Sequence, residues 1–173
     1  MKQLSSNCHP VFLPQLLILS VFVFAGGCYS FTGGSIPPHL KTLHIQTVDD
    51  QSGFGNPEYA TFLTQELIRQ FENDGSFTLV QQNADATLST VIRAVRDEVL
   101  TVQTGEQEQD RKVTVVVEAE YWDRVRKKQI WKKTFTQYRV YPVAGGAEAR
   151  DQVAQEALAA VAEDILLAVI SHW

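Results

Sequence analysis

Two stretches of the chain show the three- and four-residue spacing of amphipathic helices. The first helix is predicted between Asn56, a residue type that caps helices, and Gly75, a residue type that ends them. Its apolar stripe consists of Tyr59, Phe62, Leu63, Leu67 and Phe71. Because the polar face of this helix is not rich in lysine or arginine, we interpret the stripe as a core face and not as a membrane-surface helix.

The second helix is predicted over residues 148–170, after Pro142 and the Gly145-Gly146 break. Its stripe consists of Ala154, Leu158, Val161, Ile165 and Val169. The last turns of this helix are apolar almost all round. Two interpretations stay open for that end, since it could be enclosed within the fold or meet a partner.

Five apolar or alternating runs predict strands over residues 41–48, 77–80, 84–102, 113–121 and 130–141. The clearest is 113–121, where apolar and polar positions alternate, as in an antiparallel sheet with one wet side. The runs 77–80 and 84–102 together fit two strands or one long bent strand. In the longer run one side would carry Ala86, Leu88, Thr90, Ile92 and Ala94. Polar connections are predicted at 49–55, 103–110 and 123–129.

The resulting order is strand, helix, three or four strands, helix. It predicts an α+β fold in which two helices pack on one face of a mostly antiparallel sheet of about four strands, in the order β-α-β-β-β-α. The chain after residue 27 is long enough for one hydrophobic core and too short to expect two. We therefore predict a single domain over residues 41–173.

Residues 1–27 have the pattern of a lipoprotein signal peptide. Lys2 precedes an uncharged run from Val11 to Phe24, and the small residues 25–27 come directly before Cys28. The run is too short and too interrupted by prolines for a good membrane span. Cleavage before Cys28 would free its amine and thiol for acyl chains such as palmitate. Residues 28–40 would then be a lipidated tether. The alternative is an ordinary secretory signal peptide, in which Cys28 would have no special role.

Composition and motifs exclude several classes of function. The chain has 15 basic and 20 acidic residues and a net charge of −5, which argues against general binding to nucleic acid. Cys8 leaves with the signal and Cys28 carries lipid, so no disulfide is expected. Nucleophile, metal and phosphate-loop motifs are missing from the sequence, and Asp49 with Asp50 fits a solvated loop better than a catalytic pair. We predict no enzyme activity, no metal and no cofactor.

The only dense basic feature is the turn formed by Arg124, Arg126, Lys127 and Lys128, with Lys132 and Lys133 beyond it. Trp122 and Trp131 flank this turn. Such cations suit the phosphates of a lipid head group or glycolipid, and tryptophan suits an interface. The alternative is a solvated turn whose charges protect an edge strand.

The segment CYSFTGGSIPP from Cys28 to Pro38, followed by the strand KTLHIQTV and a capped helix, resembles the LptE family of lipopolysaccharide-assembly lipoproteins. The element order resembles that family over the whole mature chain, and its specific motif is this N-terminal segment. The resemblance implies a lipid-anchored protein on the periplasmic face of the Gram-negative outer membrane. It would be a plug inside the β-barrel protein LptD and would help lipopolysaccharide reach the outer leaflet. In the family motif one residue separates the cysteine from the tyrosine, whereas Tyr29 directly follows Cys28 here.

A second resemblance leads to a different class of function. The pattern LHIQTVDDQSG, an amphipathic helix and then GSFTLVQQ is similar to periplasmic domains of the TolB N-terminal, CsgG or LpoB type. A protein of that kind would be an export-pore component or a regulator of a cell-wall enzyme. The chain departs from this pattern at residues 50–52, where Asp-Gln-Ser replaces Asn-Arg-Ser.

Overall fold

The computed structural model describes residues 36–100 and 110–171, and all of them belong to one compact unit. The predicted signal peptide, most of the tether, Cys28 and residues 101–109 lie outside the described residues. The elements are β1 (Thr42–Ile45), β2 (Asp49–Asp50), α2 (Glu58–Asp74), β3 (Thr78–Leu79), β4 (Ala86–Val99), β5 (Asp110–Asp123), β6 (Lys128–Pro142), η1 (Val143–Gly145) and α3 (Gly146–Ser171).

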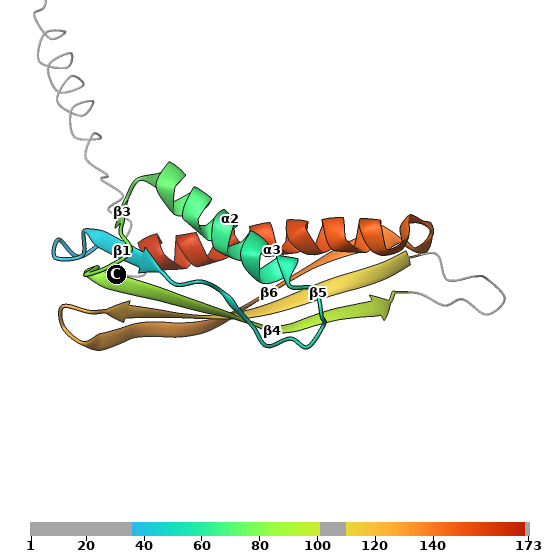
Figure 1. The fold of residues 1–173 in the computed structure, drawn as a ribbon, viewed down its shortest axis with the longest axis horizontal. Helices are drawn as coiled ribbons and strands as arrows, with labels where there is room; N and C mark the ends of the chain where they lie inside the picture. Colours follow the sequence, from blue (N-terminus) through green and yellow to red (C-terminus); the bar gives the residue numbers. More distant parts are fainter. Residues whose placement is uncertain (1–35, 101–109, 172–173) are drawn as a thin grey trace, which may run out of the picture. The chain divides into compact units, whose positions relative to one another are not determined.

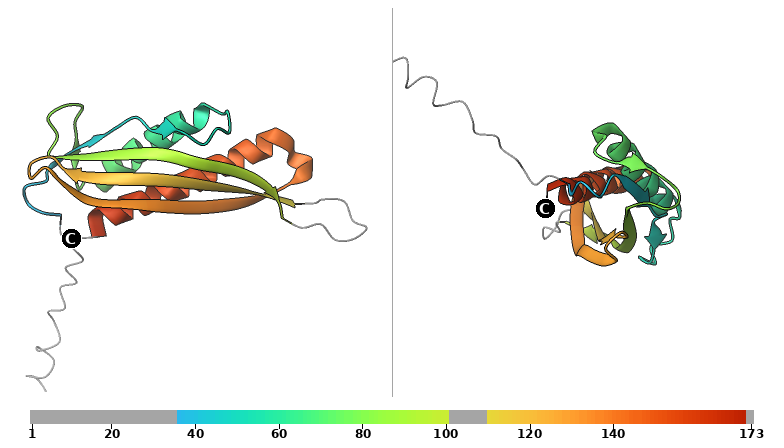
Figure 2. Two further views of the ribbon diagram at one scale, coloured as in Figure 1. Left: turned by 90° about the horizontal axis from the view of Figure 1, so that it is seen from below. Right: turned by 90° about the vertical axis from the view of Figure 1, so that its left-hand side faces the viewer.

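The α+β class and the two helices are confirmed. Figure 1 shows α2 and α3 on the same side of the sheet, and Figure 2 shows the opposite face of β4, β5 and β6 without a covering helix. The prediction of a mostly antiparallel sheet of about four strands is wrong, because the sheet has six strands and is mixed. Its order is β3-β1-β4-β5-β6, with β2 pairing to β4.

Parallel pairing is confined to the short strands at one side of the sheet. Strand β1 pairs in parallel with both β3 and β4, and β2 also pairs in parallel with β4. The connection from β1 to β3 contains β2 and helix α2, and a connection of that length lets the chain return in the same direction. The predicted loop at Asp49 and Asp50 is therefore partly wrong, since these residues form the two-residue strand β2.

The long strands β4, β5 and β6 form an antiparallel meander, as their alternation and the short polar connections between them predict. The runs at 77–80 and 84–102 contain two separate strands, β3 and the long β4, and β4 has a bulge between Ile92 and Ala94. The bulge corrects one detail of the prediction. Because the extra residue reverses the alternation, Ala94 pairs with Val116, on the face opposite to that of Ile92 and its partner Val117.

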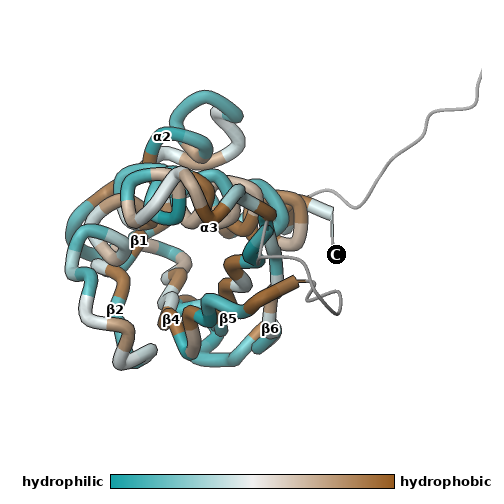
Figure 3. The backbone as a smooth tube through the Cα atoms, turned by 90° about the vertical axis from the view of Figure 1, so that its right-hand side faces the viewer, coloured by the Kyte–Doolittle hydropathy of each residue, from teal (hydrophilic) through white to brown (hydrophobic). Residues whose placement is uncertain are grey.

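The hydrophobic core lies between the helices and the sheet. Both layers contribute fully buried side chains, which include Leu43, Leu63, Leu67, Leu88, Val115, Val117 and Leu158. Figure 3 shows the two layers from one end, with α2 and α3 on one side and β4, β5 and β6 on the other. All five residues of the predicted α3 stripe have zero exposure, so this prediction is confirmed.

Local chemistry sets both ends of α2. The side-chain oxygen of Asn56 accepts a hydrogen bond from the backbone N–H of Glu58 at 3.1 Å. Gly75 adopts φ +71 and donates its N–H to the carbonyl oxygen of Phe71, as a helix-ending glycine does.

Near the end of α3, Val169 is buried whereas Leu167 is 49% exposed. Leu166 and Ile170 in the last turns are half-buried, so the described part of this end is enclosed on one side only.

Two tyrosine-carboxylate contacts connect distant elements. The Tyr59 hydroxyl donates to Asp151 at 2.8 Å and joins α2 to α3, and Arg150 Nε donates to the same carboxylate at 2.9 Å. Burial and then the Asp151 carboxylate raise the pKa of Tyr59 to about 12. The Tyr141 hydroxyl donates to Asp97 at 2.9 Å and joins β6 to β4. No described helix is long and apolar enough to span a membrane.

Candidate functional site

The basic turn connects β5 to β6 at one end of the antiparallel meander. Arg124, Arg126, Lys127 and Lys128 are all exposed, together with Val125 between them. Lys127 has φ +51, the left-handed conformation that closes the turn. The structure therefore places the four predicted site residues together at one solvent-facing tip, which we call the cationic turn.

A buried carboxylate fixes the base of the cationic turn. Asp123 is 4% exposed, and its Oδ1 atom accepts the backbone N–H of Arg126 at 2.8 Å. Its Oδ2 atom lies 2.7 Å from Nε2 of His39, in the segment before β1. Burial raises the pKa of the Asp123 carboxyl, but the bonds from Arg126 and His39 outweigh burial and hold that pKa below its usual range. The tip is thus attached to the folded body at a defined point.

The cations of the turn differ from the other basic residues nearby. Among the described residues, none of the four forms an ion pair or a side-chain hydrogen bond. By contrast, Lys132 Nζ lies 3.0 Å from a Glu118 oxygen, and Lys133 Nζ lies 5.4 Å from the centre of the Trp131 ring. The four turn residues therefore form a cluster of exposed cations without carboxylate partners, available to an anionic ligand.

The two tryptophans that flank the turn, Trp122 and Trp131, lie on opposite faces of the sheet. Trp131 packs against Tyr121 and Phe135, with ring centres 5.7 Å and 6.2 Å away, and so belongs to the core side of the sheet. Trp122 lies on the opposite face, where its indole N–H donates to Glu120 at 2.5 Å. The predicted interface role can apply only to Trp122, which lines a hollow of about 250 Å³ with Asp123, Arg124 and Lys127.

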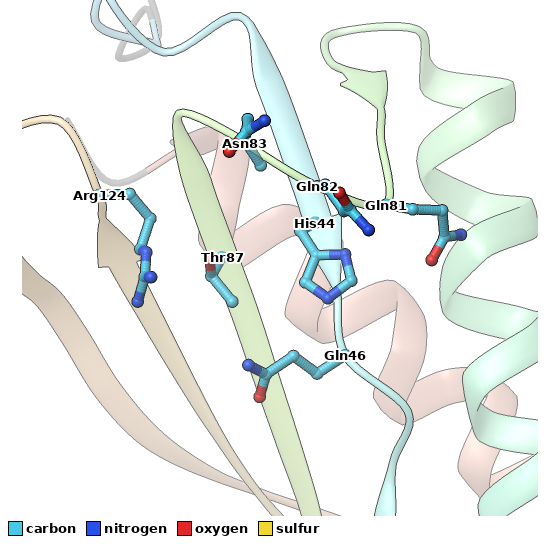
Figure 4. A pocket seen from close by; sticks show the side chains of 8 residues that line it. His44, Gln46, Gln81, Gln82, Asn83, Thr87 and Arg124 are labelled. Atoms are coloured by element: carbon cyan, nitrogen blue, oxygen red, sulfur yellow. The ribbon is translucent and has the colours of Figure 1, made fainter.

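A second hollow adjoins the cationic turn, and the sequence analysis did not predict it. It has a volume of about 350 Å³ and is lined by His44, Gln46, Gln81, Gln82, Asn83, Ala84, Thr87 and Arg124 (Figure 4). We call it the amide pocket. Its one sequence signal is the run Gln81-Gln82-Asn83 directly after a short strand.

Other candidate groups have local structural partners. The Asp49 carboxylate accepts a bond from the Gln51 side chain at 2.6 Å, and the Asp50 carboxylate accepts the backbone N–H of Ser52 at 2.8 Å. Within residues 36–100 and 110–171, no cluster of three His, Cys, Asp or Glu side chains could hold a metal ion. The predicted lipid-attachment residue Cys28 lies outside the described residues.

We expect Asp123→Asn to lower the free energy of unfolding by about 1–3 kcal/mol at neutral pH, because it removes a charged acceptor from a buried position. The folded-state pKa of Asp123 is lowered, so its stabilising effect is present above the unfolded pKa of about 4 and is lost as the pH falls through the folded value. Urea unfolding across pH 3–7 would measure this effect. The exposed Asp110, changed to Asn, is the control, and an equal loss in both variants would contradict the role of Asp123.

Comparison with known proteins identifies a family and a set of related folds. A sequence model of the family LptE, described as lipopolysaccharide-assembly, matches residues 40–169. No curated protein matches this sequence. Among solved structures, protein XCC0632 from Xanthomonas campestris has a TM-score of 0.55 and 16% identity, over 76% of this chain and 87% of that one.

Two lipoproteins have a similar fold. The rare lipoprotein B from Shewanella oneidensis has a TM-score of 0.53 and 11% identity, over 74% of this chain and 92% of that one. A minor lipoprotein from Acinetobacter baumannii has a TM-score of 0.51 and 15% identity, over 73% and 89%. At these identities the likeness concerns the fold alone.

Proposed function

Since this chain belongs to the LptE family of non-enzymatic lipopolysaccharide-assembly lipoproteins, we propose that it is the plug and assembly partner of a β-barrel of the LptD type. In this role it helps lipopolysaccharide reach the outer leaflet, from the periplasmic face of the outer membrane. The match over most of the chain favours this function over that of a TolB N-terminal, CsgG or LpoB type of domain. The two-helix, one-sheet fold agrees with it.

The anchor in this proposal is Cys28. The uncharged run that ends in Ala25-Gly26-Gly27 directly before a cysteine supports acylation at that residue. Tyr29 follows it, whereas aspartate in that place is the common signal for retention in the inner membrane. The anchor would hold the described unit close to the outer membrane through the short segment 28–40.

The ligand site in this proposal is the cationic turn. Four exposed cations without carboxylate partners stand on a turn whose base is fixed by Asp123, in a protein with a negative net charge. Guanidinium and ammonium donors suit phosphate oxygens, and lipopolysaccharide carries phosphates. The cluster of four exposed cations without carboxylate partners is the single observation that carries the assignment of the site.

Replacing Arg124, Arg126, Lys127 and Lys128 together by glutamine is expected to weaken lipopolysaccharide binding about tenfold or more at low salt. Each exposed charge pair contributes up to about 1 kcal/mol, and four such pairs act together. Binding by the parent should fall as salt rises, because exposed charges are screened over about 10 Å at 0.1 M ionic strength. Titration of labelled lipopolysaccharide into the purified lipoprotein measures both effects.

A charge-matched control removes four cations from the rest of the described unit, at Arg96, Lys112, Lys133 and Arg139. It should bind lipopolysaccharide almost as the parent does. The thermal midpoint of the turn variant should stay close to that of the parent, since the four side chains are exposed. Equal binding by the turn variant and the parent at low salt would make the turn a solvated connection without a ligand.

A further inference from the structure

The amide pocket results from an unusual path of the chain. Strands β3 and β4 flank β1, so the segment 80–85 that connects them must cross β1. Figure 4 shows this segment in front of β1 and α3 behind it, so the crossing lies on the sheet face that no helix covers. Residues His44 and Thr87, which are neighbours across β1 and β4, lie beneath it. The crossing segment forms one wall of the pocket, and Arg124 lies on the opposite side.

Hydrogen bonds hold this corner of the sheet in place. The Asp85 carboxylate accepts the backbone N–H groups of Lys41 and Thr42, both at 3.0 Å, and the Thr42 hydroxyl at 2.9 Å. The backbone N–H of Arg124 donates to the carbonyl oxygen of Asp85 at 2.8 Å. Asn83 has φ +56, a conformation that asparagine tolerates better than most residues. The backbone around the pocket is therefore fixed before any ligand arrives.

The side chains of the pocket are neutral hydrogen-bonding groups. Gln46, Gln81, Gln82 and Asn83 contribute four amides, each with donors and acceptors, and none of them forms a side-chain hydrogen bond within the described residues. His44 Nδ1 lies 3.1 Å from the carbonyl oxygen of Val80. Only a ring N–H can bond to a carbonyl, so in the neutral imidazole Nε2 is left as an acceptor. Amides and an imidazole acceptor match hydroxyl groups, which both donate and accept.

The pocket has one charged side chain, and it is a cation. Arg124 lines it, and no carboxylate does. A guanidinium suits the two oxygens of a phosphate or carboxylate group. Arg124 also lines the adjoining hollow with Trp122, whose half-buried ring could support the apolar face of a sugar ring. The two hollows together combine amides, the Arg124 guanidinium and the Trp122 ring, and the second hollow adds Lys127 and the Asp123 carboxylate, which His39 and the backbone of Arg126 already engage.

We propose that the amide pocket binds a pyranose sugar that carries one phosphate or carboxylate group. The amides and His44 bond to the sugar hydroxyls, and Arg124 bonds to the anionic group. This assignment goes beyond the proposed function, which gives the cationic turn a ligand and gives the pocket none. The same chemistry could come from the saccharide of a glycolipid or from a free anionic sugar.

The test uses the full lipoprotein in detergent and measures binding by calorimetry and saturation-transfer NMR. The probes are glucose 6-phosphate, glucuronate, glucose and inorganic phosphate. We expect both anionic sugars to bind about tenfold or more tightly than glucose or phosphate alone, because only they engage both parts of the pocket. Phosphate binding as tight as that of glucose 6-phosphate would overturn the proposal.

Two residues of the same turn provide a matched pair of variants. Arg124→Gln should weaken glucose 6-phosphate binding about tenfold, whereas Arg126→Gln, with the same loss of charge outside the pocket, should leave it nearly unchanged. Equal losses in the two variants would show general attraction to the turn and would also overturn the proposal.

A double variant separates this inference from the proposed function. Gln46→Ala with Gln82→Ala keeps every cation of the turn, and it should lose sugar binding. If it also binds lipopolysaccharide more weakly, the sugar belongs to the glycolipid, and if lipopolysaccharide binding is unchanged, the ligand is a free anionic sugar. Retained binding of glucose 6-phosphate by the double variant would refute the pocket assignment, whatever the result for the cationic turn.

Discussion

Replacing Cys28 by alanine is expected to abolish acylation and to release the protein from the membrane when no partner holds it. Two or three acyl chains bind a bilayer firmly, because each buried CH₂ group contributes about 0.8 kcal/mol. Without the thiol of residue 28 the first acyl chain has no attachment point. Mass spectrometry of the mature N-terminal peptide, together with fractionation of cells that lack the barrel, measures the effect.

The chain contains its own control for this prediction. Cys8 is the only other cysteine and lies within the predicted signal peptide, so Cys8→Ala should leave the mature N-terminus and its acyl chains unchanged. A parent protein whose Cys28 carries no lipid, or whose mature chain begins elsewhere, would contradict the anchor.

Leu158→Ala should lower the free energy of unfolding by about 2–5 kcal/mol. Leu158 has zero exposure on α3, the helix that packs against α2, β5 and β6, so truncation leaves a cavity in the hydrophobic core. A loss of that size is a large share of the 5–15 kcal/mol that stabilises a typical domain. Urea unfolding of the purified protein gives the difference directly.

The matched control is Leu167→Ala, on the same helix. Leu167 is 49% exposed, and its truncation should change stability by less than about 1 kcal/mol. Similar losses at the two positions would mean that α3 does not present the face seen here to the sheet.

The sequence predicted the parts of the fold that depend on local periodicity. The stripe of α3 and the alternation of β5 locate their own buried faces, because a helix repeats every 3.6 residues and a strand every two. Gly75 likewise marks the end of α2 through its own backbone preference. These predictions needed no knowledge of what lies across the core.

The sequence could not predict features that depend on distant partners. Whether β1 pairs in parallel with β4 is decided by the path of the chain around α2 and over the sheet, and alternation is the same in either direction. The bulge near Ala94 changes the face of a residue without any glycine or proline to mark it. Asp49 and Asp50 form a strand only because β4 offers an edge to pair with.

The two parts of the candidate site also differ in how far the sequence could predict them. The cationic turn is contiguous, so its four charges were visible in the sequence and only their lack of carboxylate partners needed the structure. The amide pocket combines β1, the crossing segment, β4 and the turn, which are up to about eighty residues apart. Such a site follows from topology, which the pattern of residues did not reveal.

The most direct test of the proposed function is extraction of the tagged lipoprotein from the outer membrane in mild detergent, followed by analysis of what remains bound to it. The proposal predicts a stable 1:1 complex with a β-barrel of the LptD type, and the variant with four glutamines in the cationic turn should retain it. Recovery of the lipoprotein only as a free monomer, from cells in which the barrel is present, would contradict the assignment as its plug and assembly partner.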